Sequence, residues 1–329
     1  MKIIKAGLLD TLQDGGRFGY QQLGINPTGA MDKYAMQLAN ILVGNAREEA
    51  VIEMHFPAAV FMFMQPALIA LSGANFAPRI NGEAVPSLQP LLVAKNDLLQ
   101  FHQPLQGASA YLAVAGGLAI DKWLNSYSTN LKAGAGGYRG RKLQQDDEIL
   151  LRNPGLFSQE EKAVTLLPWK ADTNWNQEDG DILFLPGNEW EMLTSESKEK
   201  LSNSSFAIAP QSDRMGYRLN NVPLQRSASE EIVSSAVSFG TVQLLPDGSL
   251  IILMADHQTT GGYPRIAHVI SAHHSKLAQR KAGDSIRFKL TGQATAEKLY
   301  IKQQQHLLQL QNACTFRLEE YFHGNRYKL

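Results

Sequence analysis

The chain contains a single cysteine, no excess of charge and no long hydrophobic run, and each absence excludes a class of protein. Cys314 alone excludes an internal disulfide framework and a cysteine-rich zinc module. The 31 basic and 31 acidic residues give a formal net charge of zero. That balance argues against a general nucleic-acid binder, which gathers cations on one face. The longest apolar stretch, residues 58–71, contains Gln65 and Pro66 and is too short to span a membrane.

The first residues also lack the pattern of a secretory signal. Lys2 and Lys5 place charge early, and Asp10 and Asp14 interrupt any apolar core. We therefore expect a soluble, cytoplasmic protein. Its 329 residues, 44% of them hydrophobic, are sufficient for about two folded domains, because disordered chains have lower hydrophobicity and a charge excess.

Most of the sequence has the pattern of a β-protein. Short apolar runs alternate with turn residues such as those at 72–75, 81–82 and 95–97. Pro246, Asp247 and Gly248 lie between two such runs and predict a hairpin turn. Helical spacing is confined to residues 30–43, 189–201 and 294–310, with a short helical turn at 273–282. The pattern predicts a mainly β fold with a few helices.

Two segments suggest that the chain has two related halves. Residues 142–149 and 280–286 each place an acidic turn directly before a strand. Similar turns precede other strands of the chain, so the alternative is that this is a common feature of hairpins. The polar stretch 152–180 is the best linker. We therefore predict an N-terminal half over residues 1–155, a linker over 156–180, a C-terminal half over 181–293, and a C-terminal helix with an irregular tail over 294–329.

The usual catalytic and metal-binding signatures are missing. There is no GxxxxGK[ST] phosphate loop, no HExxH helix and no GxSxG elbow. His273 and His274 are adjacent, so their side chains point in different directions and we predict no metal site. The glycine-rich residues 134–140 are either a flexible loop or a mobile loop whose N–H groups, with Arg139 or Arg141, bind an anion.

The strongest local signal is a polar loop over residues 256–265, directly after an apolar strand. Binding residues commonly lie on such loops. An aspartate can accept protons, a glutamine can donate and accept hydrogen bonds, glycines admit close backbone approach, and an arginine can bind a carboxylate or phosphate bidentately. The alternative is an ordinary tight loop held by a salt bridge between Asp256 and Arg265. The polar loop provides the candidate residues Asp256, Gln258, Thr259, Thr260, Gly261, Gly262 and Arg265.

Two further polar clusters precede that loop in the sequence. Asp32 is either a catalytic acid or the N-terminal cap of the helix that follows it. Two arginines four residues apart suit an anionic ligand, although arginines more often face solvent. The clusters provide Gln13, Asp14, Arg17 and Asp32 near the N-terminus, and Arg214 and Arg218 in the second half. From the residues alone, these loops predict a polar pocket for a small anionic molecule.

Together, these motifs resemble those of a known family, the allophanate hydrolase subunit 2 or Kip-type group, whose bacterial members include the C subunit of 5-oxoprolinase. The resemblance covers roughly residues 5–290. It is carried by TLQDGGR at 11–17, GAMD at 29–32, LAN at 38–40, VGN at 43–45, LSGA at 71–74, YLAVAGG at 111–117, SYST at 126–129, DRMGYRL at 213–219, GTVQ at 240–243, PDG at 246–248 and residues 256–265.

The resemblance implies a fold of two cyclophilin-like β-barrel halves and a set of partners. Members pair with a smaller B subunit, and the pair works with an A subunit in the ATP-dependent opening of 5-oxoproline to glutamate. Because the chain lacks a phosphate loop, ATP is expected to bind with or on a partner subunit. Related sequences form the carboxyltransferase part of urea carboxylase, where the carboxyl group comes from carboxybiotin. Others are described as antagonists of a sporulation kinase inhibitor.

We therefore interpret the chain as the C subunit of an ATP-hydrolysing 5-oxoprolinase. In this interpretation Arg214, Arg218 and Arg265 hold carboxylate or phosphate groups, and Asp256, Asp14 or Asp32 acts as an acid, a base or an orienting group. The two alternatives are a biotin-dependent carboxyltransferase component and a regulatory partner without chemistry of its own. We expect no metal, nucleic acid or membrane partner.

Overall fold

The computed structural model describes residues 1–153, 164–174, 180–220, 222–227 and 232–324. The chain divides into two compact units. The N-terminal unit comprises Met1–Arg17, Asp32–Trp175 and Gln304–Leu329, and the C-terminal unit comprises Phe18–Met31 and Asn176–Gln303. Of the predicted linker, residues 156–163 and 175–179 lie outside the described residues. The fold is mainly β, as predicted, with 31% of the described residues in strands and 21% in helices.

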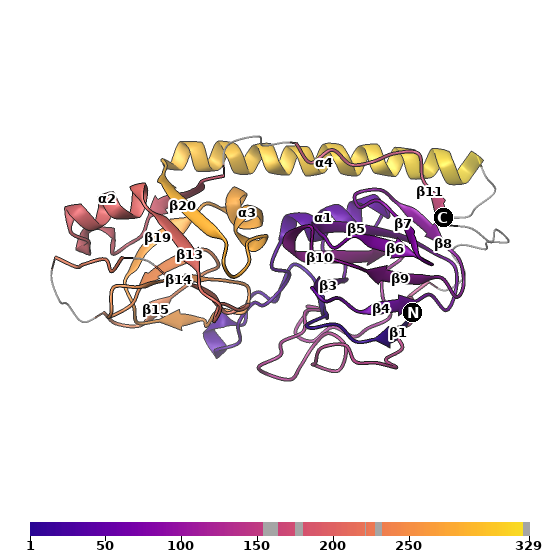
Figure 1. Cartoon of the computed structure of the whole chain (residues 1–329), viewed down its shortest axis with the longest axis horizontal. Coiled ribbons are helices and arrows are strands. Elements are labelled where there is room, and N and C mark those ends of the chain that lie inside the picture. The colour runs from indigo at the N-terminus through magenta and orange to yellow at the C-terminus, as the bar shows by residue number, and fades with distance from the viewer. Residues whose placement is uncertain (154–163, 175–179, 221, 228–231, 325–329) are drawn as a thin grey trace. The chain divides into compact units, whose positions relative to one another are not determined.

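The N-terminal unit contains two β-sheets (Figure 1). The five-stranded sheet has the order β1-β4-β9-β6-β7, with the strands β1 (Lys2–Lys5), β4 (Val60–Met62), β6 (Pro78–Ile80), β7 (Glu83–Ala84) and β9 (Leu98–Phe101). The six-stranded sheet has the order β11-β8-β5-β10-β3-β2, with β2 (Thr11–Gln13), β3 (Val51–His55), β5 (Ala67–Asn75), β8 (Leu91–Val93), β10 (Gln106–Val114) and β11 (Thr165–Leu166).

The sequence of the central strand β5 is a nearly continuous apolar run because both faces of the strand are covered. Alternate side chains of a strand point to opposite faces of the sheet. Ile69 and Leu71 belong to the hydrophobic core cluster that also contains Phe61 and Leu99 of the other sheet. On the opposite face, the hydroxyl of Ser72 donates to the carbonyl of Ala35. Both faces of β5 are therefore covered, one by the core and the other by a helix.

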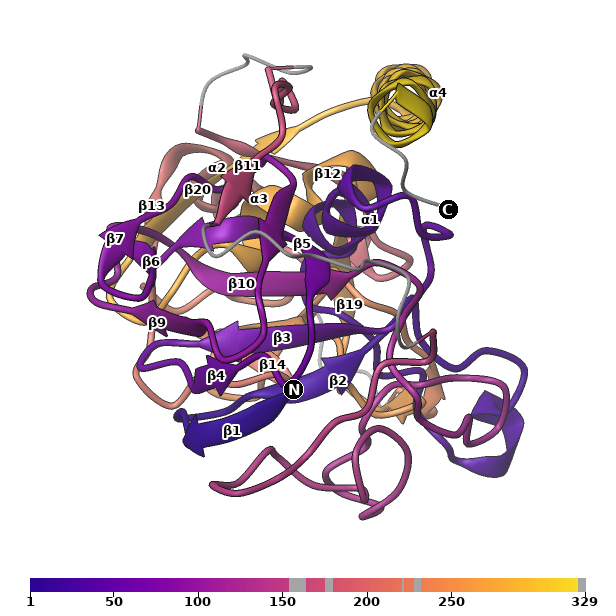
Figure 2. The same ribbon diagram turned by 90° about the vertical axis from the view of Figure 1, so that its right-hand side faces the viewer.

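That helix is α1 (Lys33–Leu42), which lies against β5 and β10 (Figure 2). Asp32 caps its first turn, because the carboxylate accepts the N–H of Ala35 at 3.0 Å. The backbone N–H of Asp32 donates to the hydroxyl of Tyr111, which in turn donates to Glu53. The predicted capping role of Asp32 is therefore confirmed.

The C-terminal unit contains a closed barrel, so the predicted barrel is confirmed for this half; the strands of the other half form the two sheets described above. The barrel core includes Phe184, Phe288 and also Met31, which comes from the short N-terminal segment of this unit. The strand order is β12-β19-β16-β17-β14-β13-β20, with β12 (Ile182–Pro186), β13 (Ser205–Ile208), β14 (Gly216–Asn220), β16 (Thr241–Leu244), β17 (Leu250–Leu253), β19 (Arg265–Val269) and β20 (Ser285–Leu290).

The predicted hairpin between β16 and β17 is present. The two strands pair antiparallel, and Gly248 adopts a φ of 82°, a conformation that favours glycine. The Asp247 carboxylate accepts hydrogen bonds from the backbone N–H and the hydroxyl of Ser249, which stabilises the turn. A separate two-stranded ribbon pairs β15 (Ser235–Ala236) with β18 (Thr260–Gly261).

The remaining α-helices of the described residues are α2 (Ser195–Asn203), α3 (His274–Ala278) and α4 (Gln293–Gly324), and short 3-10 helices span Gln21–Leu23, Trp190–Met192 and Ser271–His273. The prediction of an irregular tail after residue 310 is wrong, because α4 continues to Gly324. Leu307, Cys314, Leu318 and Phe322 are buried at spacings of seven, four and four, which places them on one helical face. Residues 325–329 lie outside the described residues.

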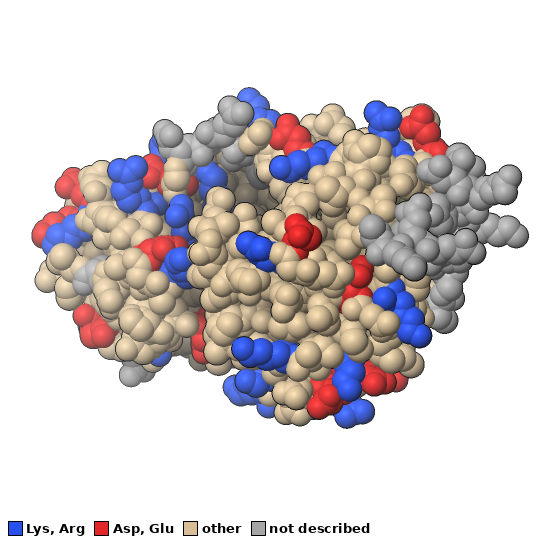
Figure 3. Space-filling view, turned by 45° about the vertical axis from the view of Figure 1, so that its right-hand side comes forward, with Lys and Arg blue, Asp and Glu red and all other residues tan. Residues whose placement is uncertain are grey.

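None of the described helices is long and apolar enough to cross a membrane. The described residues also contain no group of three His, Cys, Asp or Glu side chains arranged to hold a metal ion. His273 accepts a hydrogen bond from the N–H of Leu183 through Nδ1, and burial lowers the pKa of this histidine to about 4. On the face drawn in Figure 3, basic and acidic residues are interspersed among uncharged ones.

A buried carboxyl group in the N-terminal unit predicts a specific dependence of stability on pH. Asp10 is 1% exposed, and burial raises its pKa from 3.8 to about 7. Because the folded state favours the protonated form, this stabilisation is complete below about pH 4 and is lost as pH rises through about 7. Relative to Asp10→Asn, the wild type should lose on the order of 3 kcal/mol between pH 4 and pH 8.

Urea unfolding of both proteins across that range would measure the difference in their free energies of unfolding. A difference that does not change with pH would contradict the raised pKa of Asp10.

Candidate functional site

The predicted polar loop connects β17 and β19 of the C-terminal unit, which lie on either side of β16 in the barrel. It follows β17, forms β18 at Thr260 and Gly261, and enters β19 at Arg265. The N–H of Val237 donates to the carbonyl of Thr259, which continues the ribbon formed by β15 and β18. The loop is therefore attached along its length rather than projecting as an isolated turn.

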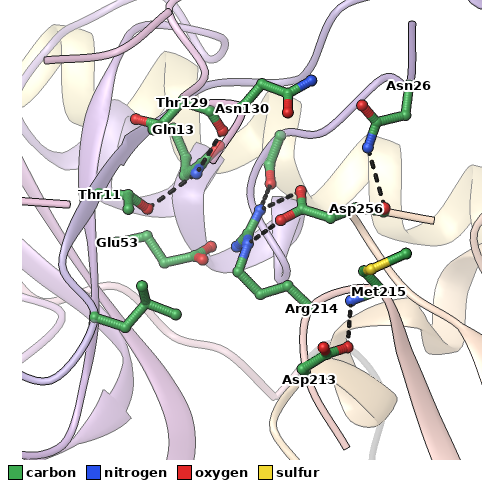
Figure 4. A network of polar contacts seen from close by, with 12 residues as sticks. Thr11, Gln13, Asn26, Glu53, Thr129, Asn130, Asp213, Arg214, Met215 and Asp256 are labelled. Carbon is green, nitrogen blue, oxygen red and sulfur yellow. Dashed lines mark hydrogen bonds and ion pairs between the residues drawn. The ribbon is translucent and has the colours of Figure 1, made fainter. Parts of the chain in front are cut away.

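The first attachment is an ion pair between Arg214 and Asp256 (Figure 4). Nε and one terminal nitrogen of Arg214 donate to the two carboxylate oxygens at 2.8 and 3.1 Å, and the N–H of Asp256 donates to the carbonyl of Arg214. The same terminal nitrogen of the guanidinium donates to the carbonyl of Gly29 at 2.7 Å. Arg214 is only 6% exposed, so the pair holds the start of the loop in a largely buried position.

The second attachment is an ion pair between Arg265 and Glu189. Nε and a terminal nitrogen of Arg265 donate to the carboxylate at 3.0 and 2.7 Å, and the backbone N–H of Arg265 also donates to it. These hydrogen bonds hold the pKa of Glu189 below its usual range. The salt bridge weighed between Asp256 and Arg265 is therefore not formed, because each of these residues pairs with another partner.

The outer wall of the barrel places a row of side chains beside this loop. Arg218 lies opposite Ile251, and Ile251 lies opposite Gln243, across the neighbouring strands β14, β17 and β16. The alternate residues Leu219, Leu250, Val242 and Leu244 belong to the barrel core. Because side chains alternate along a strand, the row faces outward.

The row and the loop together line an open pocket of about 360 Å³. Its lining includes Arg218 and Gln258, both predicted to bind an anion, and the pocket brings them together. An adjoining pocket of about 310 Å³ shares Pro246 and Tyr263 with the first, so Tyr263, which is 44% exposed, lines both. The complete lining of the first pocket is Arg218, Gln243, Leu245, Pro246, Asp247, Ile251, Gln258 and Tyr263.

Gln243 is a pocket residue that the sequence analysis missed. It is 1% exposed, and its side-chain nitrogen lies 3.5 Å from the carbonyl oxygen of Tyr263. A Cβ atom at Gly261 would lie 2.5 Å from that nitrogen, so the absence of a side chain at Gly261 leaves space for the amide. The other predicted loop residues have different positions: Thr260 and Gly262 are exposed, and Thr259 is half-buried.

In the N-terminal unit, Asp14 lies at the centre of a hydrogen-bond network. Its carboxylate accepts the hydroxyls of Ser126 and Ser128 and the backbone N–H groups of Tyr127 and Gly16. Arg17 is completely buried and donates to the carbonyls of Trp123 and Ser128. Both residues are engaged with their own chain, and their predicted contact with a substrate or anion stays a prediction.

The side-chain nitrogen and oxygen of Gln13 differ in their hydrogen bonding. Its nitrogen donates to the hydroxyl of Thr11 at 2.9 Å (Figure 4), whereas its buried oxygen has no hydrogen-bond partner among the residues the structure describes. The glycine-rich loop at 134–140 packs closely on the chain, because a Cβ atom at Gly136 would lie 2.3 Å from the carbonyl oxygen of Ser128. Nearby, Arg141 forms an ion pair with Asp147.

Comparison with known proteins decides the family. Residues 23–290 match the family described as the carboxyltransferase domain, subdomain A and B. The chain belongs to this family. It is 36% identical over 310 residues to the 5-oxoprolinase C subunit of Escherichia coli (strain K12), and the match covers 94% of this chain and 97% of that protein. It is 35% identical to the 5-oxoprolinase C subunit of Haemophilus influenzae, covering 91% of this chain and 94% of that protein.

The chain also resembles part of much larger proteins of this family. It is 28% identical to the urea amidolyase of Saccharomyces cerevisiae, covering 88% of this chain and 16% of that protein. The crystal structure of the K. lactis urea amidolyase superposes with a TM-score of 0.86 and 26% identity, covering 94% of this chain and 20% of that chain. The relation to the C subunit of 5-oxoprolinase thus extends over nearly the whole of both proteins, and the relation to urea amidolyase over one part.

Proposed function

We propose that the chain is the C subunit of an ATP-dependent 5-oxoprolinase and works together with the A and B subunits of that enzyme. The observation that carries the proposal is the near full-length similarity to two proteins named as 5-oxoprolinase C subunits. The proposed reaction opens the lactam of 5-oxo-L-proline to give L-glutamate, with hydrolysis of ATP.

Chemistry explains why such a reaction needs ATP and a positively charged group. Amide resonance makes the lactam carbonyl a poor electrophile. Phosphorylation of the carbonyl oxygen would activate it, and preorganised donors would stabilise the developing negative charge. In this chain Arg218 faces an open pocket, whereas Arg214 and Arg265 each bind a carboxylate of the chain itself. We assign anion binding to Arg218, and the other two arginines position the loop.

ATP is assigned to a partner protein of the complex. A helix N-terminus binds phosphate through free N–H groups and its positive dipole end. In this chain the carboxylate of Asp32 occupies the N-terminus of α1, and Glu196 lies in the first turn of α2. Either carboxylate would repel a polyphosphate, so the described α1 and α2 do not provide a nucleotide site.

The second candidate function is the carboxyltransferase component of a biotin-dependent enzyme. It is favoured by the structural similarity to urea amidolyase and urea carboxylase, with TM-scores of 0.86 and 0.85. The chain spans only 20% and 29% of those structures, so carboxybiotin would have to arrive on another protein.

Reconstitution distinguishes the two functions. The full chain is mixed with its cognate A and B subunits, and glutamate release from 5-oxo-L-proline is followed with and without ATP. We expect ATP-dependent glutamate release that is lost when any one chain is omitted.

Glutamate release at the same rate without this chain would overturn the proposal. A complex that forms without releasing glutamate, yet carboxylates urea when a carboxybiotin carrier is added, would establish the second candidate function instead.

A further inference from the structure

We propose that the pocket beside Arg218 is the binding subsite for a small cyclic amide that carries a carboxylate, 5-oxo-L-proline being the ligand under the proposed function. The inference rests on that function for the identity of the ligand. The site itself is argued from the charges, amides and aromatic surface that the barrel wall and the loop place together in the C-terminal unit.

The carboxylate would bind Arg218. This side chain is exposed on the outer face of β14 and lines the pocket. Unlike Arg214 and Arg265, it forms no ion pair with any residue that the structure describes. A guanidinium fork binds a carboxylate with two parallel hydrogen bonds, which fixes the orientation as well as the position of the ligand.

The amide would bind two glutamines. Gln243 and Gln258 both line the pocket, and each side chain offers a carbonyl acceptor and an NH₂ donor. A lactam presents the complementary groups, one N–H and one C=O. Among the described residues, the side-chain nitrogen of Gln243 approaches the carbonyl oxygen of Tyr263 at 3.5 Å, which is at the limit of a hydrogen bond, so the amide can still hydrogen-bond a ligand.

The other residues that line the pocket favour a small ligand with a single carboxylate. Asp247 places a carboxylate in the same pocket as Arg218, and its hydrogen bonds from Ser249 hold the pKa of Asp247 below its usual range. One cation beside one anion disfavours a polyphosphate and suits a ligand with one carboxylate and one N–H group. Tyr263 and Pro246 supply apolar surface for a small ring. A pocket of about 360 Å³ lies within the range of small-molecule sites.

The first test measures binding to the full-length chain alone, by calorimetry or ligand-observed NMR. The probes are 5-oxo-L-proline, 2-pyrrolidinone, which lacks the carboxylate, and L-proline, which lacks the ring carbonyl. We expect 5-oxo-L-proline to bind about 10- to 100-fold more tightly than either analogue, as expected for hydrogen bonds to charged or buried groups. Equal binding of all three compounds, or no binding of 5-oxo-L-proline, would overturn the inference.

Two variants assign the contacts. Arg218→Ala should lower the affinity for 5-oxo-L-proline to that for 2-pyrrolidinone, and Gln258→Leu should remove the preference over L-proline. The matched control is Arg287→Ala, because Arg287 is also an exposed strand arginine of this unit but pairs with Asp181. An equal loss in Arg218→Ala and Arg287→Ala would show a nonspecific charge effect and overturn the assignment.

The assembled enzyme separates this inference from the proposed function. In the complex with the A and B subunits, Arg218→Ala should raise KM for 5-oxo-L-proline about 10- to 100-fold, with Arg287→Ala unchanged. Wild-type activity combined with an unchanged KM in Arg218→Ala would overturn the subsite and leave the function intact. Binding of 5-oxo-L-proline to the isolated chain without activity of the wild-type complex would support the subsite and overturn the function.

Discussion

Replacing Arg214 with alanine should destabilise the C-terminal unit by about 3–5 kcal/mol, because it leaves a largely buried carboxylate without its cation. Arg214 and Asp256 are 6% and 15% exposed, and two hydrogen bonds of 2.8 and 3.1 Å join them. The substitution also removes the hydrogen bond to the carbonyl of Gly29. We therefore expect the decrease in the free energy of unfolding to be several times larger than the decrease caused by removing a surface ion pair.

Hydrogen exchange of the β17 and β19 amides would measure this loss within the C-terminal unit. The double variant Arg214→Ala/Asp256→Ala should be less destabilised than the sum of the two single variants, because it leaves no unpaired charge. Arg287→Ala serves as the control: its pair with Asp181 has exposed fractions of 64% and 26%, and its loss should stay below about 1 kcal/mol. Comparable losses in Arg214→Ala and the control would contradict the buried-pair argument.

Asp14→Ala should destabilise the N-terminal unit by about 3–5 kcal/mol. The carboxylate accepts four hydrogen bonds, from the hydroxyls of Ser126 and Ser128 and from the backbone of Tyr127 and Gly16. Asp14 itself is 5% exposed, so the substitution leaves several donors without an acceptor in a region with little water.

Exchange rates of the amides in residues 11–17 and 126–129 would locate this effect. Asp14→Asn is the informative companion, because it keeps one oxygen and should recover part of the loss. Asp146→Asn is a suitable control, since this aspartate is 67% exposed, pairs with Lys2 at 3.0 Å, and has a φ of 67°, which asparagine tolerates. Unchanged exchange in Asp14→Ala would show that the serine and backbone donors find other acceptors.

The features predicted correctly from the sequence are those with local causes. The cap at Asp32 and the hairpin at Asp247 depend on residues within three positions of each other. Barrel closure depends on the pairing of β12 with β20, whose partners Ile182 and Phe288 lie more than a hundred positions apart. No short window of sequence contains such a pairing, so the barrel was implied only by the family resemblance.

The same distinction applies to the pocket. Arg218 and Gln258 belong to polar clusters and were predicted as anion-binding residues, whereas Gln243 is a single polar residue within an apolar strand. The register across β14, β17 and β16 places Gln243 in the same row as Arg218, and the loop brings Gln258 to the same pocket. Glu189 was missed for a similar reason, because its partner Arg265 lies 76 positions away. The tail was predicted wrongly because its apolar residues are interspersed with basic and other polar ones, although the buried residues Cys314, Leu318 and Phe322 keep helical spacing.

The C-terminal unit is made of two segments that lie far apart in the sequence, and this constrains how the protein can fold as it is synthesised. Residues 18–31 leave the ribosome early, yet Met31 packs in the barrel core and Gly29 accepts a hydrogen bond from Arg214. The rest of its unit begins only at Asn176, after residues 32–175 have been made, and β20 completes the barrel only at Leu290. This unit therefore cannot complete its fold until β20 has been synthesised. A fragment that begins after residue 176 would lack part of its own core, so the chain cannot be divided into two independently expressed halves at a single cut.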